Sequence, residues 1–329
     1  MSANKQEVYL GIDLGGSKIL TAVVADRGEI LSRDYRITPA SDGLDAVIRE
    51  VLKSATSALA PLGIAMQELA AIGIGAPGIS DPAMGVIFTS PNLPEWHNVP
   101  LRDIIARETG RKSYLINDAN AAALGELYFG AARGVRHMVY VTISTGIGGG
   151  IIIDGQLYTG SVGTAGEIGH MTIDASGPRC QCGNTGCWEV LASGTALADR
   201  ARQQIRDGAK TSILDDAGGD LEKVTAPVIQ AAAERGDPLA RELIAKTGYY
   251  IGVGLANLIN IFNPELIVIG GGLSNIGEAL LSPAFQVAGE RAFKEAYQAV
   301  RFALPELGAD SGVLGAAAFA RQSVSGEDK

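Results

Sequence analysis

The chain has 329 residues, a length that suggests about two domains. It carries 36 acidic and 27 basic residues, and the net charge of −9 argues against a protein that binds nucleic acid or an anionic membrane surface. Apolar residues make up 47% of the sequence, which is enough for a substantial core and excludes a disordered chain. No stretch reaches the roughly 18 apolar residues that span a bilayer, and the first residues lack the apolar run of a signal peptide. We therefore expect a cytoplasmic protein with no membrane partner.

The first half of the sequence alternates predicted strands and helices, which is typical of an α/β fold. The predicted strands lie between residues 8 and 24, where two of them flank a glycine turn, and at 29–33, 70–75 and 113–116. The predicted helices lie at 43–62, 101–109 and 117–128. The proline- and glycine-rich segment 77–100 is expected to be an ordered loop with little regular structure.

The pattern of the N-terminus then begins again in the segments HMVYVTI, STGIGGG and IIIDGQLY, with Tyr9 and Tyr140 setting the offset at 131 residues. This repetition predicts two related α/β lobes with a cleft between them, although two glycine-rich hairpins can also resemble each other by chance. The remaining predictions are mostly helix at 227–261, a strand at 265–269, a helix from about residue 277 and a short last helix at 313–321.

The first motif that carries chemistry is the glycine turn between the two N-terminal strands, which contains Asp13, Gly15, Gly16, Ser17 and Lys18. Glycines let the backbone approach phosphate oxygens, and successive N–H groups form a concavity that binds anions. Asp13 would face a magnesium ion, directly or through water, because hard cations take oxygen ligands. The alternative is an ordinary tight turn in which Asp and Gly serve turn geometry.

Two further glycine turns follow strands. Thr145 and Gly146 belong to the repeat of the first turn, and Gly271 and Gly272 lie between a predicted strand and a predicted helix. Three such turns suit a nucleotide held across a cleft. The segment 73–78 also matches the letters GxGxxG, but no helix can begin in ISDPAMG, so we reject a dinucleotide site there.

All three cysteines, Cys180, Cys182 and Cys187, fall within eight residues and follow His170 closely. One imidazole and three thiolates can complete a tetrahedral zinc site with no open position, which predicts a structural rather than a catalytic metal. Glu167 and Glu189 flank this cluster and could accept hydrogen bonds from hydroxyl groups, or they could be surface charges.

The last motif is Asn117-Asp118-Ala119-Asn120, at a strand end where an alanine-rich helix begins. Asp118 could cap that helix, a role worth about 1 kcal/mol, or it could point at a substrate hydroxyl. One residue can have both roles, and the sequence alone does not choose between them.

Taken in order, these motifs resemble the ROK family (repressor, open reading frame, kinase) of sugar kinases. The matching segments run from residue 8 to about 315 and are DLGGSK, GxGAPG with NLPEW, NDAN, STGIGGG, ExGH followed by CxCGxxGCxE, and IVIGGGLS. The resemblance implies an actin-like, hexokinase-type (ribonuclease H-like) fold with duplicated βββαβα lobes. The small lobe would comprise residues 1–118 and about 311–329, and the large lobe residues 119–310, with the zinc site and the interface of a homodimer or homotetramer.

The resemblance also implies a reaction, the transfer of the γ-phosphate of ATP, bound with Mg²⁺, to a sugar hydroxyl. Asp118 would be the catalytic base, and one His170 nitrogen would bind zinc while the other faces the sugar. The implied sugar-binding residues are Asn117, Asp118, Glu167, His170 and Glu189, with Gly78 and Asn92 as weaker candidates. The implied ATP and Mg²⁺ residues are Asp13, Gly15, Gly16, Ser17, Lys18, Thr145, Gly146, Gly271 and Gly272.

Several functions compete within this resemblance. Glucose is the favoured substrate, which makes glucokinase the leading interpretation, with N-acetylmannosamine, N-acetylglucosamine or fructose kinases as alternatives. A non-catalytic sugar sensor is the alternative from another class. A repressor is disfavoured, because Asp13 leaves no room before it for a DNA-binding domain and the chain is acidic.

Overall fold

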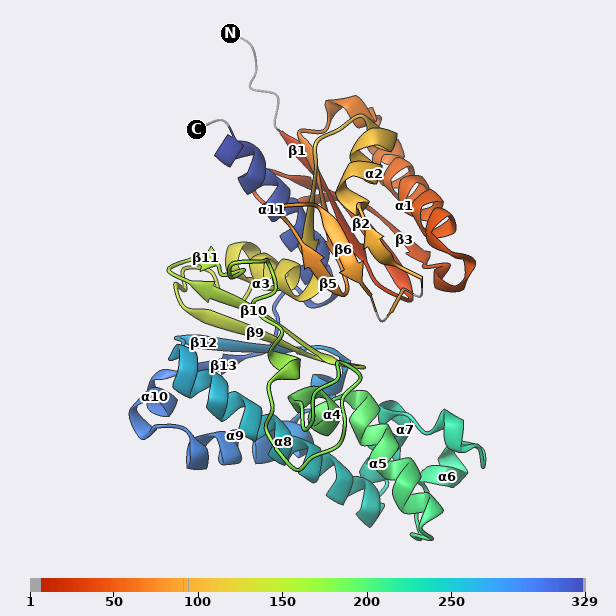
Figure 1. Cartoon of the computed structure of the whole chain (residues 1–329), viewed down its shortest axis with the longest axis vertical. Coiled ribbons are helices and arrows are strands. Elements are labelled where there is room, and N and C mark those ends of the chain that lie inside the picture. Colours follow the sequence, from red (N-terminus) through yellow and green to blue (C-terminus); the bar gives the residue numbers. More distant parts are fainter. Residues whose placement is uncertain (1–6, 91, 94, 328–329) are drawn as a thin grey trace. The chain divides into compact units, whose positions relative to one another are not determined.

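The computed structural model describes residues 7–90, 92–93 and 95–327 (Figure 1). Contacts between Cα atoms divide the chain into two compact units. Unit 1 consists of Met1–Arg136, Gly150–Gly166 and Pro305–Lys329, and unit 2 of His137–Gly149 and Glu167–Leu304.

Unit 1 is built on a five-stranded sheet with the order β3-β2-β1-β4-β8. Its strands are β1 (Val8–Leu14), β2 (Lys18–Ala25), β3 (Ile30–Ile37), β4 (Ala71–Ala76) and β8 (Ser113–Asn117). The first three strands are antiparallel, whereas β4 runs parallel to both β1 and β8. Because side chains alternate along a strand, Leu10 and Ile12 pack with α1 (Leu44–Leu59) and α2 (Leu101–Thr109), while Tyr9 packs with α11 (Ser311–Glu327). Helix α3 (Asp118–Phe129) lies against α11 on that second face (Figure 1).

The second sheet repeats this order as β11-β10-β9-β12-β13, which confirms the duplication that the sequence predicts. Its strands are β9 (Met138–Ile143), β10 (Ile147–Ile153), β11 (Gln156–Leu157), β12 (Leu266–Gly270) and β13 (Arg301–Ala303). Strands β9 and β12 carry the buried Val139 and Ile267, which pack with Leu255 of the long helix α8. The helices of unit 2 are α4 (Trp188–Ala192), α5 (Gly194–Arg206), α6 (Ile213–Asp216), α7 (Ala226–Glu234), α8 (Pro238–Phe262), α9 (Glu278–Arg291) and α10 (Lys294–Ala299).

Short 3-10 turns connect these elements. They are η1 (Ala40–Asp42), η2 (Ala60–Leu62), η3 (Met66–Glu68), η4 (Ile168–His170), η5 (Leu221–Lys223), η6 (Gly272–Ile276) and η7 (Gly308–Asp310). Among the helices of the described residues, none has both the length and the apolar character needed to cross a membrane.

The expectation that segment 77–100 has little regular structure is wrong. It contains a small antiparallel sheet of β5 (Ile79–Asp81), β6 (Val86–Thr89) and β7 (His97–Val99). Asp81 closes the first hairpin, because its carboxylate accepts the Met84 N–H at 3.0 Å and its carbonyl accepts the Gly85 N–H at 2.8 Å. Strands of three or four residues are too short to produce a readable alternation of polar and apolar residues.

Two other boundaries differ from the expected ones. Helix α11 starts at Ser311 and extends to Glu327, beyond the range 313–321. Residues 119–136 belong to unit 1 because α3 packs closely on α11. The division into a small lobe of residues 1–118 and about 311–329 and a large lobe of residues 119–310, which the resemblance implies, stays a prediction.

Candidate active site

The first glycine turn is a closed hairpin between β1 and β2. The Gly15 N–H donates to the Lys18 carbonyl at 2.8 Å, and Thr38 donates its hydroxyl to the Gly15 carbonyl at 2.7 Å. A Cβ on Gly16 would lie 2.6 Å from the Asn92 carbonyl oxygen, so this position requires glycine. The structure thus brings together Gly16 and Asn92, two of the predicted site residues. Ser17 at the tip of the turn is exposed.

Asp13 lies near the end of β1, just before this turn, and is partly buried. Burial and the negative charge of Asp118 raise the pKa of Asp13 to about 6, while the positive charge of Lys18 lowers it. A Cβ on Gly312, at the start of α11, would lie 2.9 Å from Asp13 Cγ. Asp13, Lys18 and Asp118 are therefore electrostatic neighbours in a crowded site that holds two carboxylates.

Asn117, and not Asp118, caps helix α3. The Asn117 side chain accepts the N–H groups of Ala119 at 3.0 Å and Asn120 at 3.2 Å, and its amide donates to the Gly78 carbonyl at 3.4 Å. The prediction that Asp118 caps helix α3 is wrong, since Asp118 is the first residue inside the helix. Burial raises the pKa of Asp118, although the hydrogen bond from the Ala119 N–H opposes this shift. The cap therefore leaves this carboxylate available for chemistry.

The second glycine turn in unit 2 is held by the start of helix α5. The Gly194 N–H donates to the Ser144 carbonyl at 2.7 Å, and the Thr195 hydroxyl donates to the Thr145 carbonyl at 2.8 Å. The third turn lies beside it, because Gly271, with φ +86°, packs against the Ile143 backbone, and a Cβ on Gly272 would lie 3.9 Å from Ser144 Oγ. Thr145, Gly146, Gly271 and Gly272 thus lie on adjacent turns.

Glu189 also lies at the second glycine turn. Its Oε2 accepts the Ile147 N–H at 2.8 Å, and any side chain on Gly146 would collide with this carboxylate. Glu189 is in the first turn of α4, directly after Cys187 and the fully buried Trp188. The indole N–H of Trp188 donates to the Tyr250 carbonyl at 2.9 Å, which fixes α4 on α8. The position of Glu189 is thereby set by both the core and the glycine turn.

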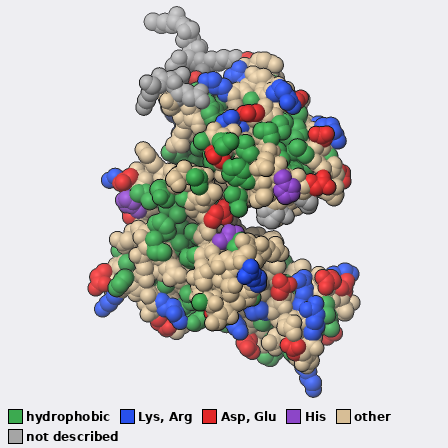
Figure 2. Space-filling view, viewed as in Figure 1, with side chains coloured by type: hydrophobic (Ala, Val, Ile, Leu, Met, Phe, Trp, Pro, Cys, Tyr) green, Lys and Arg blue, Asp and Glu red, His purple; other side chains and the backbone are tan. Residues whose placement is uncertain are grey.

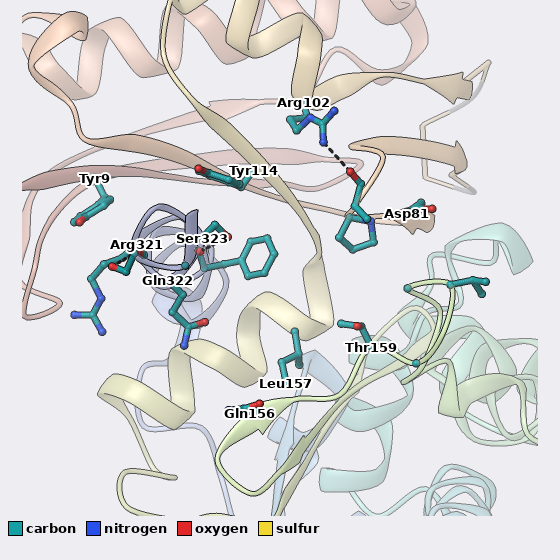
Figure 3. Close-up of a pocket in the computed structure, with 18 of the residues that line it drawn as sticks. Tyr9, Asp81, Arg102, Tyr114, Gln156, Leu157, Thr159, Arg321, Gln322 and Ser323 are labelled. Atoms are coloured by element: carbon teal, nitrogen blue, oxygen red, sulfur yellow. Dashed lines mark hydrogen bonds between the residues drawn. The ribbon is translucent and has the colours of Figure 1, made fainter. Parts of the chain in front are cut away.

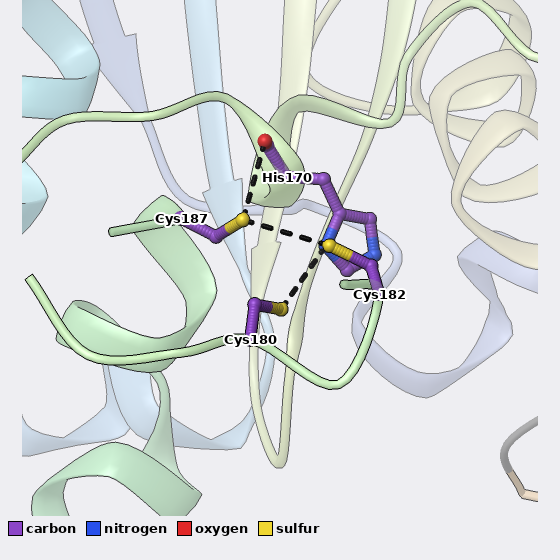
Figure 4. A group of neighbouring side chains, drawn as sticks. All are labelled: His170, Cys180, Cys182 and Cys187. Carbon is purple, nitrogen blue, oxygen red and sulfur yellow. Dashed lines mark hydrogen bonds between the residues drawn. The ribbon is translucent and has the colours of Figure 1, made fainter. Parts of the chain in front are cut away.

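His170, Cys180, Cys182 and Cys187 form one cluster whose four possible ligand atoms lie within 4.8 Å of one another (Figure 4). Cys180 Sγ is 3.7 Å from His170 Nδ1, and Cys182 Sγ is 3.7 Å from Cys187 Sγ. Two sulfurs on a tetrahedral zinc ion are separated by about 3.8 Å for Zn–S bonds of about 2.3 Å. The donor set and its spacing therefore fit a tetrahedral metal site, with Nδ1 as the imidazole ligand.

Without a metal, the pKa values of the thiols of the cluster are shifted in different directions, and the hydrogen bond from the Asn184 backbone lowers the pKa of Cys182. Burial raises the pKa of the Cys187 thiol to about 12, so the protein alone does not favour the thiolate that binds a metal. A bound cation would supply that stabilisation. Glu167 precedes η4, which ends in His170, and is exposed.

The predicted residues form two sets. Unit 1 brings together Asp13, Lys18, Asn117, Asp118 and Gly78, and also Gly16 with Asn92, while unit 2 joins the second and third glycine turns, Glu189 and the metal cluster. Sequence reasoning missed Gly312 and Thr195. The sequence feature that could have indicated Gly312 is its place at the start of an alanine-rich helix, because a glycine there often marks a point where another group lies close to the backbone.

A separate cavity of about 1120 Å³ lies within unit 1 (Figure 3). It is lined among others by Tyr9, Asp81, Arg102, Leu157 and Arg321, and by none of the predicted site residues. On the face shown in Figure 2, basic side chains are interspersed with acidic ones.

Comparisons with known proteins agree with these motifs. The family model described as "ROK family" matches residues 9–323. The glucokinase of Thermotoga maritima is 38% identical, with 96% of this chain and 98% of that protein covered. The xylose repressor of Caldicellulosiruptor bescii is 33% identical, with coverage of 94% of this chain and 77% of the repressor.

Among solved structures, a ROK family glucokinase from Streptomyces griseus, in complex with glucose and AMPPNP, has a TM-score of 0.82 and 34% identity. The alignment covers 96% of this chain and 99% of that one. These matches extend over nearly the whole chain and include both sets of site residues. The chain belongs to the ROK family and has its two-lobed, actin-like sugar kinase fold.

Proposed function

We propose that the chain is an ATP-dependent hexose kinase that converts glucose and ATP into glucose 6-phosphate and ADP. The observation that carries this proposal is Asp118, a carboxylate that Asn117 relieves of the capping role and that lies close to Asp13 at a glycine turn. The glucokinases among the relatives, at 33–38% identity, support the same activity.

In the proposed step, Asp118 accepts the proton of the sugar 6-hydroxyl while the hydroxyl oxygen attacks the γ-phosphorus. The bond between this phosphorus and the oxygen bridging to the β-phosphate breaks, and ADP leaves with that oxygen. Phosphoryl transfer depends mainly on positioning and on neutralising charge. A carboxylate with a raised pKa is suited to hold a proton transiently.

The proposed sugar-binding side chains act through groups that can form hydrogen bonds with sugar hydroxyls. Asn117, Glu167, His170 and Glu189 form the proposed sugar set, with Gly78 and Asn92 as weaker members. His170 uses Nδ1 in the metal cluster, so Nε2 is the nitrogen that can meet a sugar hydroxyl. We infer that the cluster holds a structural Zn²⁺, which fixes the imidazole ring and its tautomer.

The nucleotide would be held by backbone N–H groups at the glycine turns. Gly15, Gly16, Ser17 and Lys18 form the first proposed phosphate turn, in which the Gly15 N–H closes the hairpin on Lys18 and the N–H groups after it would hold the phosphate. Thr145 and Gly146 form the second phosphate turn, and Gly271 and Gly272 the adenosine side. Asp13 is the residue that would hold Mg²⁺, directly or through water, because Mg²⁺ prefers carboxylate oxygens. When bound, Mg²⁺ neutralises negative charge on the phosphates.

We also propose that the protein assembles as a homodimer or homotetramer through unit 2. Large apolar side chains are exposed there, with Ile261 at 67% and Phe293 at 72% of their full exposure. The use of ATP and of reduced thiols suits the cytoplasm. Light scattering of the purified chain would measure the number of subunits.

The sugar preference is tested by a coupled assay of ADP release with MgATP against glucose, N-acetylmannosamine, N-acetylglucosamine, fructose, mannose and allose. A dominant rate with glucose is the expected result. A preference for an N-acetylated sugar or for fructose would replace the substrate and keep the mechanism. No turnover with any sugar, in protein loaded with zinc, would overturn the kinase proposal and favour a sugar sensor.

A further inference from the structure

Glu126 is a fully buried carboxylate in helix α3, with 0% exposure. It accepts four hydrogen bonds. Oε2 accepts the N–H groups of Ala131 at 2.9 Å and Glu306 at 3.0 Å, and Oε1 accepts the Leu307 N–H at 3.1 Å and the Ser311 hydroxyl at 2.7 Å. No cation is among these partners, so the negative charge is stabilised by hydrogen-bond donors. Such charge-assisted hydrogen bonds are stronger than neutral ones.

The four donors come from two segments that are far apart in the sequence. Ala131 lies just after α3, shortly before the chain leaves unit 1 at Arg136. Glu306, Leu307 and Ser311 lie where the chain re-enters unit 1 at Pro305 and starts α11. One carboxylate therefore binds to α3 both the segment where the chain first leaves unit 1 and the segment where it returns for the last time.

The return segment leads directly to the reactive carboxylates. Ser311 is followed by Gly312, which is packed against the Asp13 carboxylate so closely that a Cβ would lie 2.9 Å from Asp13 Cγ. Helices α3 and α11 touch through their backbones here, since a side chain on Gly125 would collide with the Ser311 carbonyl. Asp118 is the first residue of the same α3.

We propose that Glu126 is a positioning residue that holds the start of α11 on α3 and thereby fixes Asp13 relative to Asp118. This inference rests on the proposed kinase function, in which these two carboxylates act on the same reaction. Glu126 itself touches neither substrate in this account. Its effect passes through Ser311 and Gly312, because these two residues link its carboxylate to that of Asp13.

The test uses Glu126→Gln and Ser311→Ala in the full chain, with the exposed Glu29→Gln as the matched control. A glutamine places an NH₂ group against donors that now bind an oxygen, whereas Ser311→Ala removes one hydrogen bond and leaves the other three. We expect Glu126→Gln to lower kcat by about 10- to 100-fold, the scale of a small misplacement of reacting groups, with little change in the KM for glucose. Ser311→Ala should change kcat in the same direction by less.

If Glu126 only stabilised the fold, its replacement would not change the pKa of Asp13. If α11 withdraws from Asp13, this carboxylate gains water and its pKa falls, so in Glu126→Gln the acidic limb of the profile of kcat/KM for MgATP, which reports the enzyme before MgATP binds, should shift to lower pH. Faster amide hydrogen exchange in residues 305–312, measured without substrates, should accompany this shift. Glu29→Gln should leave kcat, the pH profile and exchange unchanged.

An unchanged kcat and pH profile in folded Glu126→Gln would overturn the proposal, as would a loss of stability with a normal profile. If Glu126→Gln fails to fold, Ser311→Ala provides the test instead. A normal pH profile and normal hydrogen exchange in Ser311→Ala would then overturn the proposal. Absence of turnover in the wild-type protein with any hexose would instead overturn the proposed function. In that case, faster exchange of residues 305–312 in Glu126→Gln would still show that the carboxylate holds the start of α11, and unchanged exchange would show that it does not.

Discussion

Asn117 carries the cap of helix α3 that its neighbour Asp118 could have provided. The Asn117 side chain accepts the Ala119 and Asn120 N–H groups, and Asp118 begins the helix with its carboxylate in the partly buried site beside Asp13. Two adjacent polar residues at one helix start thus have separate roles. Substitutions of Asn117 are therefore expected to change stability, and substitutions of Asp118 to change turnover.

Replacing Asn117 tests the structural role. Asn117→Ala removes the acceptor of the Asn120 N–H and one of the two acceptors of the Ala119 N–H, and it should lower the free energy of unfolding by about 1 kcal/mol. Asn117→Ser keeps a capping oxygen and should recover most of this loss. Chemical denaturation of both variants measures the difference, and equal stability of the alanine and serine variants would show that the cap contributes nothing.

The raised pKa of Asp13 predicts how stability depends on pH. Because the folded protein holds the Asp13 proton more tightly than the unfolded chain, the stabilising contribution is complete below about pH 4 and is lost as the pH rises through about 6. Asp13→Asn should therefore be more stable than the wild type at pH 7, by at most about 3 kcal/mol and less because the side chain is partly exposed.

At pH 4 the two proteins should differ little. The measurement is chemical denaturation at both pH values without Mg²⁺ or nucleotide, since a bound cation would stabilise the ionised carboxylate. A variant that is less stable than the wild type at pH 7 would contradict the assignment of an electrostatically strained Asp13.

The metal cluster predicts one zinc ion per chain in purified protein, measured by elemental analysis. Cys182→Ser should lose this ion, because the exposed Cys182 supplies one of four ligands. We expect the KM for glucose to rise more than kcat falls, since His170 and the neighbouring Glu189 belong to the proposed sugar set. Ala175→Ser, on the same exposed stretch, is the control. Full zinc occupancy in Cys182→Ser, or an unchanged KM after zinc removal, would refute this account.

The sequence predicts those parts of the molecule that depend on local pattern. The three cysteines and His170 were readable because their spacing alone suits one metal ion, and the strand–turn–strand repeat near Tyr9 and Tyr140 indicated the duplication. The hairpins β5–β7 were missed because three- and four-residue strands carry no period. No sequence pattern marks Glu126, since its donors at 306, 307 and 311 are about 180 positions away in the chain.

The central claim is that Asp118 takes the proton of a hexose hydroxyl during phosphate transfer from ATP. The most direct measurement is the formation of glucose 6-phosphate by Asp118→Asn and by the wild type, with glucose binding measured in parallel by calorimetry. An asparagine keeps the shape of the side chain but cannot accept the proton, so turnover should fall by about 10²- to 10⁴-fold while glucose binding largely survives. Near-normal turnover in Asp118→Asn would contradict the account.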